Sequence, residues 1–253
     1  MLIKEIKTDS LTTLIYDSRD SMGRAAARAA AEAIKAVLAE KKSANVIFAA
    51  APSQNETLKY LLLEDIDFTR INAYHMDEYV GLSINEPQSF ARYLSDHVFS
   101  LAPFASVSYI PAKESPESAC ELYSTLLKEN PPDVVLMGIG ENGHIAFNDP
   151  PVADFADKAL IKKVELDPVC RMQQVHDKCF ETLDDVPKYA LTLTVPALMS
   201  AGHLICTVPA STKRDAVKEM LCGSIDEHCP ASALRLHKSA KMFLDPDSAS
   251  LVL

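Results

Sequence analysis

The chain has 253 residues, of which 48% are hydrophobic and 24% are charged, and its formal net charge is -10. This length suits one large α/β domain, or less readily two small ones, and the acidic balance argues against a nucleic-acid-binding surface, which needs a basic patch. No apolar stretch approaches the roughly 20 residues of a membrane-spanning helix, so no membrane partner is expected.

The N-terminal segment, Met1 to Lys7, carries charges where a signal peptide needs an unbroken apolar run, and we therefore expect a cytoplasmic location. The six cysteines are scattered without a C-x-x-C pair, which indicates reduced thiols. Cys222, His228 and Cys229 lie close together in the sequence, but their spacing matches no common zinc pattern. No metal site is expected.

Strand and helix patterns alternate along the chain. An extended segment near 13–16 precedes a long helix over 18–42, and a strand over 45–51 leads into a helix capped by Ser53, with Glu56 three residues later. Further strands are predicted near 70–75, 107–110, 133–139, 190–195 and 204–208, and further helices near 87–99, 116–128 and 210–221. This alternation predicts a doubly wound, mainly parallel, Rossmann-like α/β sheet with helices on both faces, in a single domain over residues 1–253.

The segment from Asp133 to Pro150 holds the first candidate for chemistry. Its apolar run, 134–137, fits a strand covered on both faces, and the glycine-rich turn that follows contains His144, with Asp149 five residues later. Glycines let the backbone approach a ligand closely, and ligands bind at the carboxyl ends of strands in an open α/β sheet. The sequence therefore places His144 for proton transfer rather than for packing.

Two adjacent acids, Asp77 and Glu78, follow the predicted strand near 70–75 and are expected at the same sheet edge as His144. Burial at this position disfavours the charged form of a carboxylate, which makes it a better proton acceptor. A solvated loop or a helix-capping pair is the alternative for this segment taken alone. His75, two residues before Asp77, is a candidate to line the pocket, whereas the histidines outside the motifs are expected at the surface or in packing roles.

Two basic residues are candidates for binding an anion. Lys213 follows Ser211 and Thr212 at the end of the predicted strand 204–208, where hydroxyls, backbone N–H groups and an ammonium group make a reasonable anion site. Arg171 offers a guanidinium that can bind phosphate through two parallel hydrogen bonds. Taken singly, a capped helix start and a surface arginine account for these residues without any ligand.

Taken together, these motifs resemble the glucosamine-6-phosphate deaminase/isomerase family. The resemblance rests on 75–82, His-Met-Asp-Glu-Tyr-Val-Gly-Leu, and on 138–150, Gly-Ile-Gly-Glu-Asn-Gly-His-Ile-Ala-Phe-Asn-Asp-Pro, with a third similar segment at 186–192. It extends from the strand at 45 to about residue 241. It implies conversion of glucosamine 6-phosphate to fructose 6-phosphate and ammonia by an aldose–ketose isomerisation, which needs neither a metal nor an organic cofactor.

The resemblance also implies four catalytic residues. Asp77 matches the carboxylate that moves a proton between C2 and C1 of the open-chain sugar, and His144 matches the histidine that assists opening of the pyranose ring. Asn142 falls where family members carry Asp or Asn beside that histidine. Asp149 falls where they usually carry Glu, and one methylene less shortens its reach by more than a hydrogen bond tolerates unless the backbone compensates.

Substrate binding is expected from seven residues, namely Ser53, Gln54, Asn55, Glu78, Gly143, Arg171 and Lys213. Lys213 and Arg171 match the phosphate contacts of the family. The turn at 49–56 departs from the family, which usually has a Gly- and Thr-rich turn there, because it contains no glycine. An anion could still lie on the helix N-terminus with help from Ser53 and Asn55, although Glu56 puts a negative charge close by.

Two other functions are compatible with the sequence. A 6-phosphogluconolactonase shares the turn around His144 but continues Thr-Ala-Ser-Leu-Phe-Pro, where this chain has Ile-Ala-Phe-Asn-Asp-Pro. A non-catalytic sugar-phosphate-binding protein has no need of both Asp77 and His144. The expected partner is a small-molecule sugar phosphate, and a homo-oligomer is left open. The few residues after Asp247 are not expected to form a regulatory site.

Overall fold

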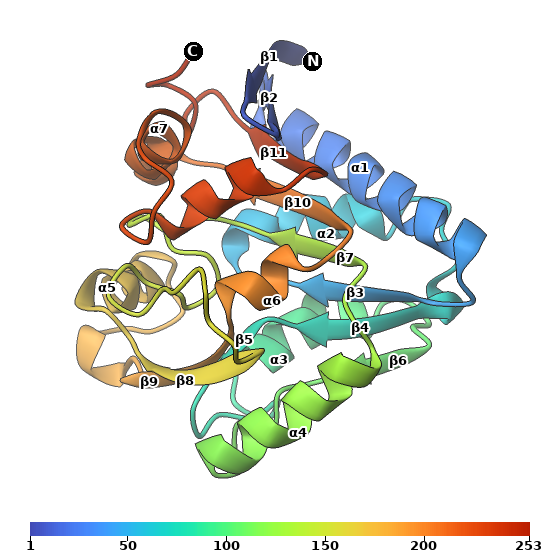
Figure 1. The fold of residues 1–253 in the computed structure, drawn as a ribbon, viewed down its shortest axis with the longest axis vertical. Helices are drawn as coiled ribbons and strands as arrows, with labels where there is room; N and C mark the ends of the chain where they lie inside the picture. The colour runs from blue at the N-terminus through green and yellow to red at the C-terminus, as the bar shows by residue number, and fades with distance from the viewer.

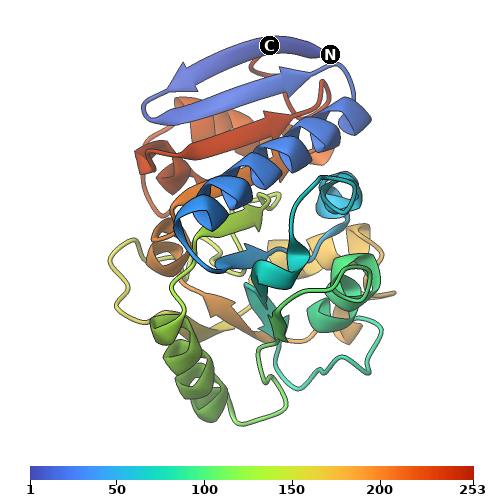
Figure 2. The same ribbon diagram turned by 90° about the vertical axis from the view of Figure 1, so that its right-hand side faces the viewer.

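The computed structural model of the protein describes residues 1–253 and contains a large central sheet, helices around it and a second, smaller sheet (Figure 1, Figure 2). The strands of the central sheet are β1 (Leu2–Thr8), β2 (Leu11–Tyr16), β3 (Ala44–Phe48), β4 (Ile71–His75), β6 (Ser106–Ser108), β7 (Val134–Met137), β10 (His203–Val208) and β11 (Ala240–Leu244). Their order is β1-β2-β11-β10-β7-β3-β4-β6. Only β1 runs antiparallel to its neighbour, so the predicted mainly parallel sheet is confirmed.

Helices cover both faces of this sheet, as predicted. The α-helices are α1 (Arg19–Glu40), α2 (Asn55–Leu61), α3 (Phe90–Leu94), α4 (Pro116–Glu129), α5 (Pro168–His176), α6 (Val195–Met199) and α7 (Arg214–Cys222). Successive residues of a strand point to opposite faces, so Val134 and Leu136 pack in one core cluster with α1, α2 and α3. Val135 and Met137 pack in the other with α4, α6 and α7. Burial on both sides explains why β7 is apolar at every position.

The start of α1 lies close to α2. Ser18 caps α1 by accepting a hydrogen bond from the backbone N–H of Ser21 at 3.2 Å. A Cβ atom at Gly23 would lie 2.3 Å from the Cβ of Glu56, so only glycine at this position permits the close crossing of the two helices. This crossing brings the first residue of α1, Arg19, next to Glu56 and to the segment that follows β3.

The smaller sheet is antiparallel and consists of β5 (Asp77–Tyr79), β9 (Tyr189–Leu193) and β8 (Ile161–Glu165), in that order. Asp77 pairs with Thr192 across 115 positions of sequence, which ties the segment after β4 to the second half of the chain. The segment 190–195 was expected as one more strand of the parallel sheet, and that expectation is wrong. β9 instead pairs antiparallel with β5 and β8 and lies outside the central sheet.

Short helical turns lie between the main elements, namely the 3-10 turns η1 (Pro52–Gln54), η2 (Phe68–Arg70), η4 (Leu183–Asp185), η5 (Ser211–Lys213) and η6 (Pro230–Leu236), and the π turn η3 (Ser95–Phe99). The predicted cap at Ser53 is wrong, because Pro52 starts the turn η1 one residue earlier and Ser53 lies inside it. The sequence patterns also did not predict β1, β5, β8, β11, α5 or α6. None of the helices combines the length and the apolarity needed to cross a bilayer.

Candidate active site

A cleft lies at the carboxyl ends of four neighbouring strands, β10, β7, β3 and β4. Its cavity volume is about 120 Å³. The segments that follow the strands line it, at 49–53, 76–77, 138–140, 209–210 and 212–213. From β3 the chain proceeds to β4 and β6 on one side, whereas β7, β10 and β11 lie on the other. The cleft therefore lies where the strand order reverses, which is the usual ligand site of an open α/β sheet.

Asp77 enters this cleft from the first position of β5. Its side chain is 7% exposed, and burial, followed by the charge of the neighbouring Glu78, raises the pKa of the Asp77 carboxyl well above the usual range. No hydrogen-bond donor of the protein counteracts this effect. A buried carboxylate without donors is a strong proton acceptor for a ligand in the cleft.

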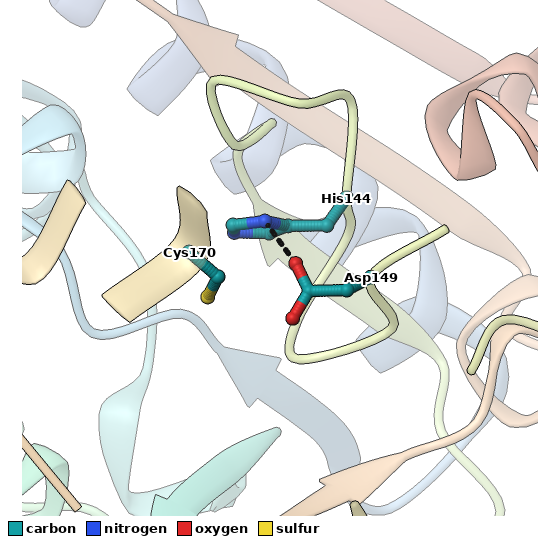
Figure 3. A group of neighbouring side chains, drawn as sticks. All are labelled: His144, Asp149 and Cys170. Atoms are coloured by element: carbon teal, nitrogen blue, oxygen red, sulfur yellow. Dashed lines mark ion pairs between the residues drawn. The ribbon is translucent and has the colours of Figure 1, made fainter. Parts of the chain in front are cut away.

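His144 faces the same cleft and is oriented by Asn142 and Asp149 of its own turn. Figure 3 shows the ion pair of His144 with Asp149. Its Nδ1 lies 2.7 Å from Oδ1 of Asn142 and 2.9 Å from Oδ1 of Asp149. The Asn142 amide donates to the same Asp149 oxygen at 2.9 Å, which fixes the Asn142 oxygen toward the ring. Since both neighbours of Nδ1 are acceptors, the proton of the neutral imidazole belongs on Nδ1, and Nε2 is left to exchange protons with a ligand.

Asp149 is fully buried behind the imidazole. Burial alone would raise its pKa, but the contacts with His144 and Asn142, and the backbone N–H of Asp167 at 3.3 Å, hold the pKa of the Asp149 carboxyl below its usual value. Asp149 thus remains charged and can stabilise a protonated His144. The backbone compensates for the side chain of Asp149, which is one methylene shorter than Glu, because the turn brings its Cα close enough for the carboxylate to reach the ring.

Cys170, on α5, completes a buried group with His144 and Asp149 (Figure 3). One potential ligand atom from each residue lies within 4.8 Å of the others, a donor set that zinc can use. Burial and the neighbouring Asp149 charge raise the pKa of the Cys170 thiol well above its usual value. The thiol therefore stays protonated at neutral pH, and a metal ion here would have to displace that proton and the contact between His144 and Asp149.

Two glycines shape the turn that carries His144. A Cβ atom at Gly140 would lie 2.2 Å from Cε1 of the His144 ring, so the ring can lie against the backbone only because residue 140 has no side chain. Gly143 has a φ of +83°, and its carbonyl accepts a hydrogen bond from the N–H of Ala231 at 2.9 Å. Gly143 does not line the cleft, so its position supports the shape of the turn rather than a direct contact with substrate.

Lys213 provides the positive charge of the cleft. Its side chain is 6% exposed, and its ammonium group has no hydrogen-bond partner in the protein. Burial lowers the pKa of Lys213, while the carboxylate of Asp177 opposes this shift. An unpartnered buried ammonium group is costly, and an anionic ligand in the cleft would satisfy it. Ser53 and Thr212 also line the cleft and add hydroxyl groups.

Arg19 is a second cation of the cleft, and the sequence analysis did not identify it. Its Nε lies 2.8 Å from the carboxylate of Glu56, and its guanidinium donates to the carbonyl of Pro52 at 2.6 Å. The ion pair neutralises the Glu56 charge that was expected to oppose an anion at the turn 49–56. Arg19 also holds that turn through its hydrogen bond to the carbonyl of Pro52.

Arg171 and Glu78 do not line the cleft, so their predicted contacts with substrate lack support. The Arg171 guanidinium donates to the carbonyls of Leu183 and Val186, at 2.6 and 2.9 Å, and so braces the segment after α5. The Glu78 carboxylate is buried and accepts hydrogen bonds from three backbone N–H groups, those of Tyr79, Phe90 and Ala91. It fixes the start of α3, although burial raises its pKa to about 7.

Three further candidates also lie outside the cleft lining. The Gln54 amide donates to the carbonyl of Thr207 at 3.2 Å, and the Asn55 side chain accepts from the hydroxyl of Tyr93, so both link strands and helices behind the cleft. His75 is fully buried against aromatic rings, and burial lowers its pKa to about 3. It is therefore a neutral packing residue rather than part of the pocket.

The helix α5 and the segment after it contribute four lining residues that the sequence analysis missed, Gln173, Gln174, Asp177 and Cys179. The Gln173 side chain accepts a hydrogen bond from the N–H of Glu141 at 2.9 Å, which connects α5 to the turn before His144. The pair Asp167-Pro168 could have indicated the start of α5 in the sequence, because an N-cap acid followed by proline commonly begins a helix, as it does here.

Comparison with known proteins identifies the family of this chain. Residues 17–243 match the family described as glucosamine-6-phosphate isomerases/6-phosphogluconolactonase. The chain belongs to this family. Among curated members, it is 35% identical to a glucosamine-6-phosphate deaminase of Listeria monocytogenes over 211 residues, which cover 82% of this chain and 88% of the relative. It is 30% identical to a glucosamine-6-phosphate deaminase of Lactobacillus delbrueckii subsp. bulgaricus over 208 residues, 81% of this chain and 86% of the relative.

Solved structures of the glucosamine-6-phosphate isomerase/6-phosphogluconolactonase family share the fold. A monomeric glucosamine-6-phosphate deaminase matches with a TM-score of 0.86 and 30% identity, covering 94% of this chain and 99% of that one. A 6-phosphogluconolactonase from Trypanosoma brucei matches with a TM-score of 0.77 and 15% identity, covering 99% of this chain and 100% of that one. The second similarity is one of fold alone.

Proposed function

We propose that this chain is an amino-sugar-phosphate isomerase/deaminase that converts glucosamine 6-phosphate, or a close relative, to fructose 6-phosphate and ammonia. The observation that carries the proposal is the meeting of Asp77, His144 and Lys213 in one cleft. A carboxylate without donors, an oriented imidazole and an unpartnered ammonium group are the base, the acid–base and the anion contact that this reaction needs. Relatives named for this activity at 30–35% identity support the same function.

The phosphate of the substrate would occupy the end of the cleft that Lys213 and Arg19 border. Lys213 supplies the ammonium group, while Ser53 and Thr212 supply hydroxyl donors. These contacts do not involve the reacting carbons, so they contribute binding and orientation of the sugar. Asp77 and His144 then face the other end of the substrate.

His144 would assist opening of the pyranose ring. Its Nε2 accepts the proton of the C1 hydroxyl and returns a proton to the ring oxygen as the C1–O5 bond breaks, so that the free aldehyde forms. The charge on the imidazole during this transfer is stabilised by Asp149, which lies 2.9 Å from Nδ1. Asn142 holds the side chains of His144 and Asp149 in this orientation through its amide.

Asp77 would then move a proton from C2 to C1 of the open chain. Removal of the C2 proton gives a 2-amino enol, and return of that proton to C1 gives the C2 imine. Addition of water to the imine and loss of the amino group release fructose 6-phosphate and ammonia. The raised pKa of Asp77 suits it to this step, because a more basic carboxylate is a better acceptor for a proton bound to carbon.

The test is to measure ammonia release and ketose-phosphate formation from glucosamine 6-phosphate, with galactosamine 6-phosphate and 6-phosphogluconolactone in parallel. We expect turnover of an amino sugar phosphate and none of the lactone. Turnover of the lactone alone would replace the proposal with a lactonase function, which His144 and the shared fold also permit. Binding of the phosphates without any turnover would instead indicate a sugar-phosphate-binding protein.

A further inference from the structure

Ala210 has an unfavourable backbone conformation in the wall of the cleft. Its φ of +80° and ψ of 147° lie in a region that residues with a Cβ atom rarely adopt. It stands between the end of β10 and the turn η5, and it lines the cleft together with Thr212 and Lys213. Such a conformation persists only where the surroundings hold it, so a specific contact is expected at this residue.

That contact is made by Asp245. Both oxygens of its carboxylate accept the N–H of Ala210, at 3.2 and 3.1 Å, and Oδ1 also accepts the N–H of Ser248 at 2.8 Å. Asp245 is 3% exposed and follows β11, whose Leu244 pairs with Val208 at the end of β10. The carboxylate is thus presented to Ala210 by the pairing of two central strands.

The effect of this contact extends to Lys213. The carbonyl of Ala210 accepts the N–H of Lys213 at 3.1 Å, which closes the turn η5. Rotation of Ala210 into an ordinary conformation would move this carbonyl and with it the backbone of Lys213. The buried ammonium group has no partner in the protein that could keep it in place.

We propose that Asp245 is a positioning residue for anion binding, because it holds Ala210 in its left-handed conformation and thereby keeps Thr212 and Lys213 directed at the phosphate. Asp245 does not line the cleft, so it acts through Ala210 and not by contact with the ligand. The identity of the ligand as a sugar phosphate rests on the proposed function. The link between Asp245 and the turn η5, which carries Lys213, does not depend on the proposed function.

The experiment compares Asp245→Asn, Ala210→Gly, the double variant, the wild type and the control Asp247→Asn. Asparagine retains the shape but removes the charge and replaces one acceptor oxygen with a donor NH2 group, which repels the N–H of Ala210 and weakens the hold on that residue. Glycine adopts a positive φ without strain, so the turn no longer depends on the carboxylate. Asp247 is an exposed acid two residues away whose side chain makes neither a hydrogen bond nor a salt bridge. Inorganic phosphate is the probe, and its Kd is measured by calorimetry. KM and kcat for the amino sugar phosphate and the Tm of each variant are measured in parallel.

We expect Asp245→Asn to raise the Kd for phosphate and the KM about tenfold, with kcat within about twofold of the wild type. In the double variant, the Kd and the KM should return to within about threefold of the wild-type values. Asp247→Asn should change neither the Kd nor the KM. An unchanged Kd in Asp245→Asn, a lower Tm as its only effect, or a defect that Ala210→Gly does not relieve would overturn the proposal. So would a wild type that does not bind phosphate. If the wild type binds phosphate but does not deaminate any amino sugar phosphate, the proposed function fails while the Kd series still decides the role of Asp245.

Discussion

Asp77 and Asp149 are two buried carboxylates of one site with opposite surroundings. Asp149 has contacts with the imidazole of His144, the amide of Asn142 and a backbone N–H, and its pKa is lowered. Asp77 has no donor, and its pKa is raised. The fully partnered carboxylate orients its neighbour, whereas the unpartnered one is left to act on a ligand.

Lys213, like Asp77, is a buried charged group without a hydrogen-bond partner in the protein. Its ammonium group is buried without a partner, while the guanidinium of Arg19, which also lines the cleft, is paired with Glu56. Leaving a buried charged group unsatisfied costs stability, and the cost is recovered only when the ligand is bound. Substitution of an unpartnered group should therefore lower activity or affinity, whereas substitution of a partnered structural group should lower stability.

The largest effect is expected for Asp77→Asn. Turnover should fall by ~10³-fold, because the amide cannot carry the proton, while KM stays within a few-fold of the wild type. The Tm should stay constant or rise, since a poorly solvated carboxylate has been removed. Steady-state kinetics and a thermal scan measure both quantities.

Glu78→Gln is the matched contrast, because the adjacent carboxyl does not line the cleft. Its loss should lower the Tm, since three backbone N–H groups lose their charged acceptor, and should leave turnover within about tenfold. Wild-type turnover in Asp77→Asn, or a greater loss of turnover in Glu78→Gln, would reverse the assignment of the two acids.

Asp149→Asn is expected to lower kcat on the order of 10²-fold with little change in KM. The asparagine amide would face Nδ1 as a donor and favour the other imidazole tautomer, so that Nε2 could no longer accept a proton. Asp167→Asn is the control, because Asp167 lies nearby but caps α5 and its side chain does not contact the ring. An unchanged kcat in Asp149→Asn would mean that the carboxylate does not orient His144.

Lys213→Met should raise the Kd for phosphate and the KM by about 10- to 100-fold with kcat nearly unchanged. The free protein should become more stable, by about 1 kcal/mol in urea unfolding, because a buried unpartnered ammonium group is replaced by an apolar chain. Lys218→Met, on the exposed side of α7, controls for loss of surface charge. Unchanged affinity would place the phosphate elsewhere, for example on the turn at Ser53.

The smallest effect is a shift in pH dependence. Asp77 must be ionised to accept a proton, and its pKa is raised, so kcat/KM should fall with decreasing pH well above the ordinary carboxyl value of 3.8. The pKa of Asp149 is lowered, so the stability it contributes is present at neutral pH and is lost only as the pH falls through its folded-state pKa. An acidic limb near 3.8 in the kcat/KM profile would contradict the desolvation of Asp77.

The sequence alone determined six of the eight strands of the central sheet, all except β1 and β11, and the main reactive groups. Buried strands followed by glycine, acid or Ser-Thr-Lys turns are local patterns, and parallel strands bring such turns to one edge whatever the rest of the chain does. For this reason Asp77, His144, Ser53 and Lys213 were predicted, and all four line the cleft. The pairing of His144 with Asp149 followed from their place in one short turn.

Only the tertiary structure decided the contacts between segments that are distant in the sequence. The crossing of α1 and α2 brings Arg19 to Glu56, the pairing of β5 with β9 carries Asp77 into the cleft, and the pairing of β10 with β11 brings Asp245 to Ala210. Arg171 was predicted to bind phosphate because its residue type fits, yet it lies outside the cleft lining and its Nη2 donates to two nearby carbonyls. A residue type shows what a side chain can bind, and only the packing of the folded chain decides which partner it meets.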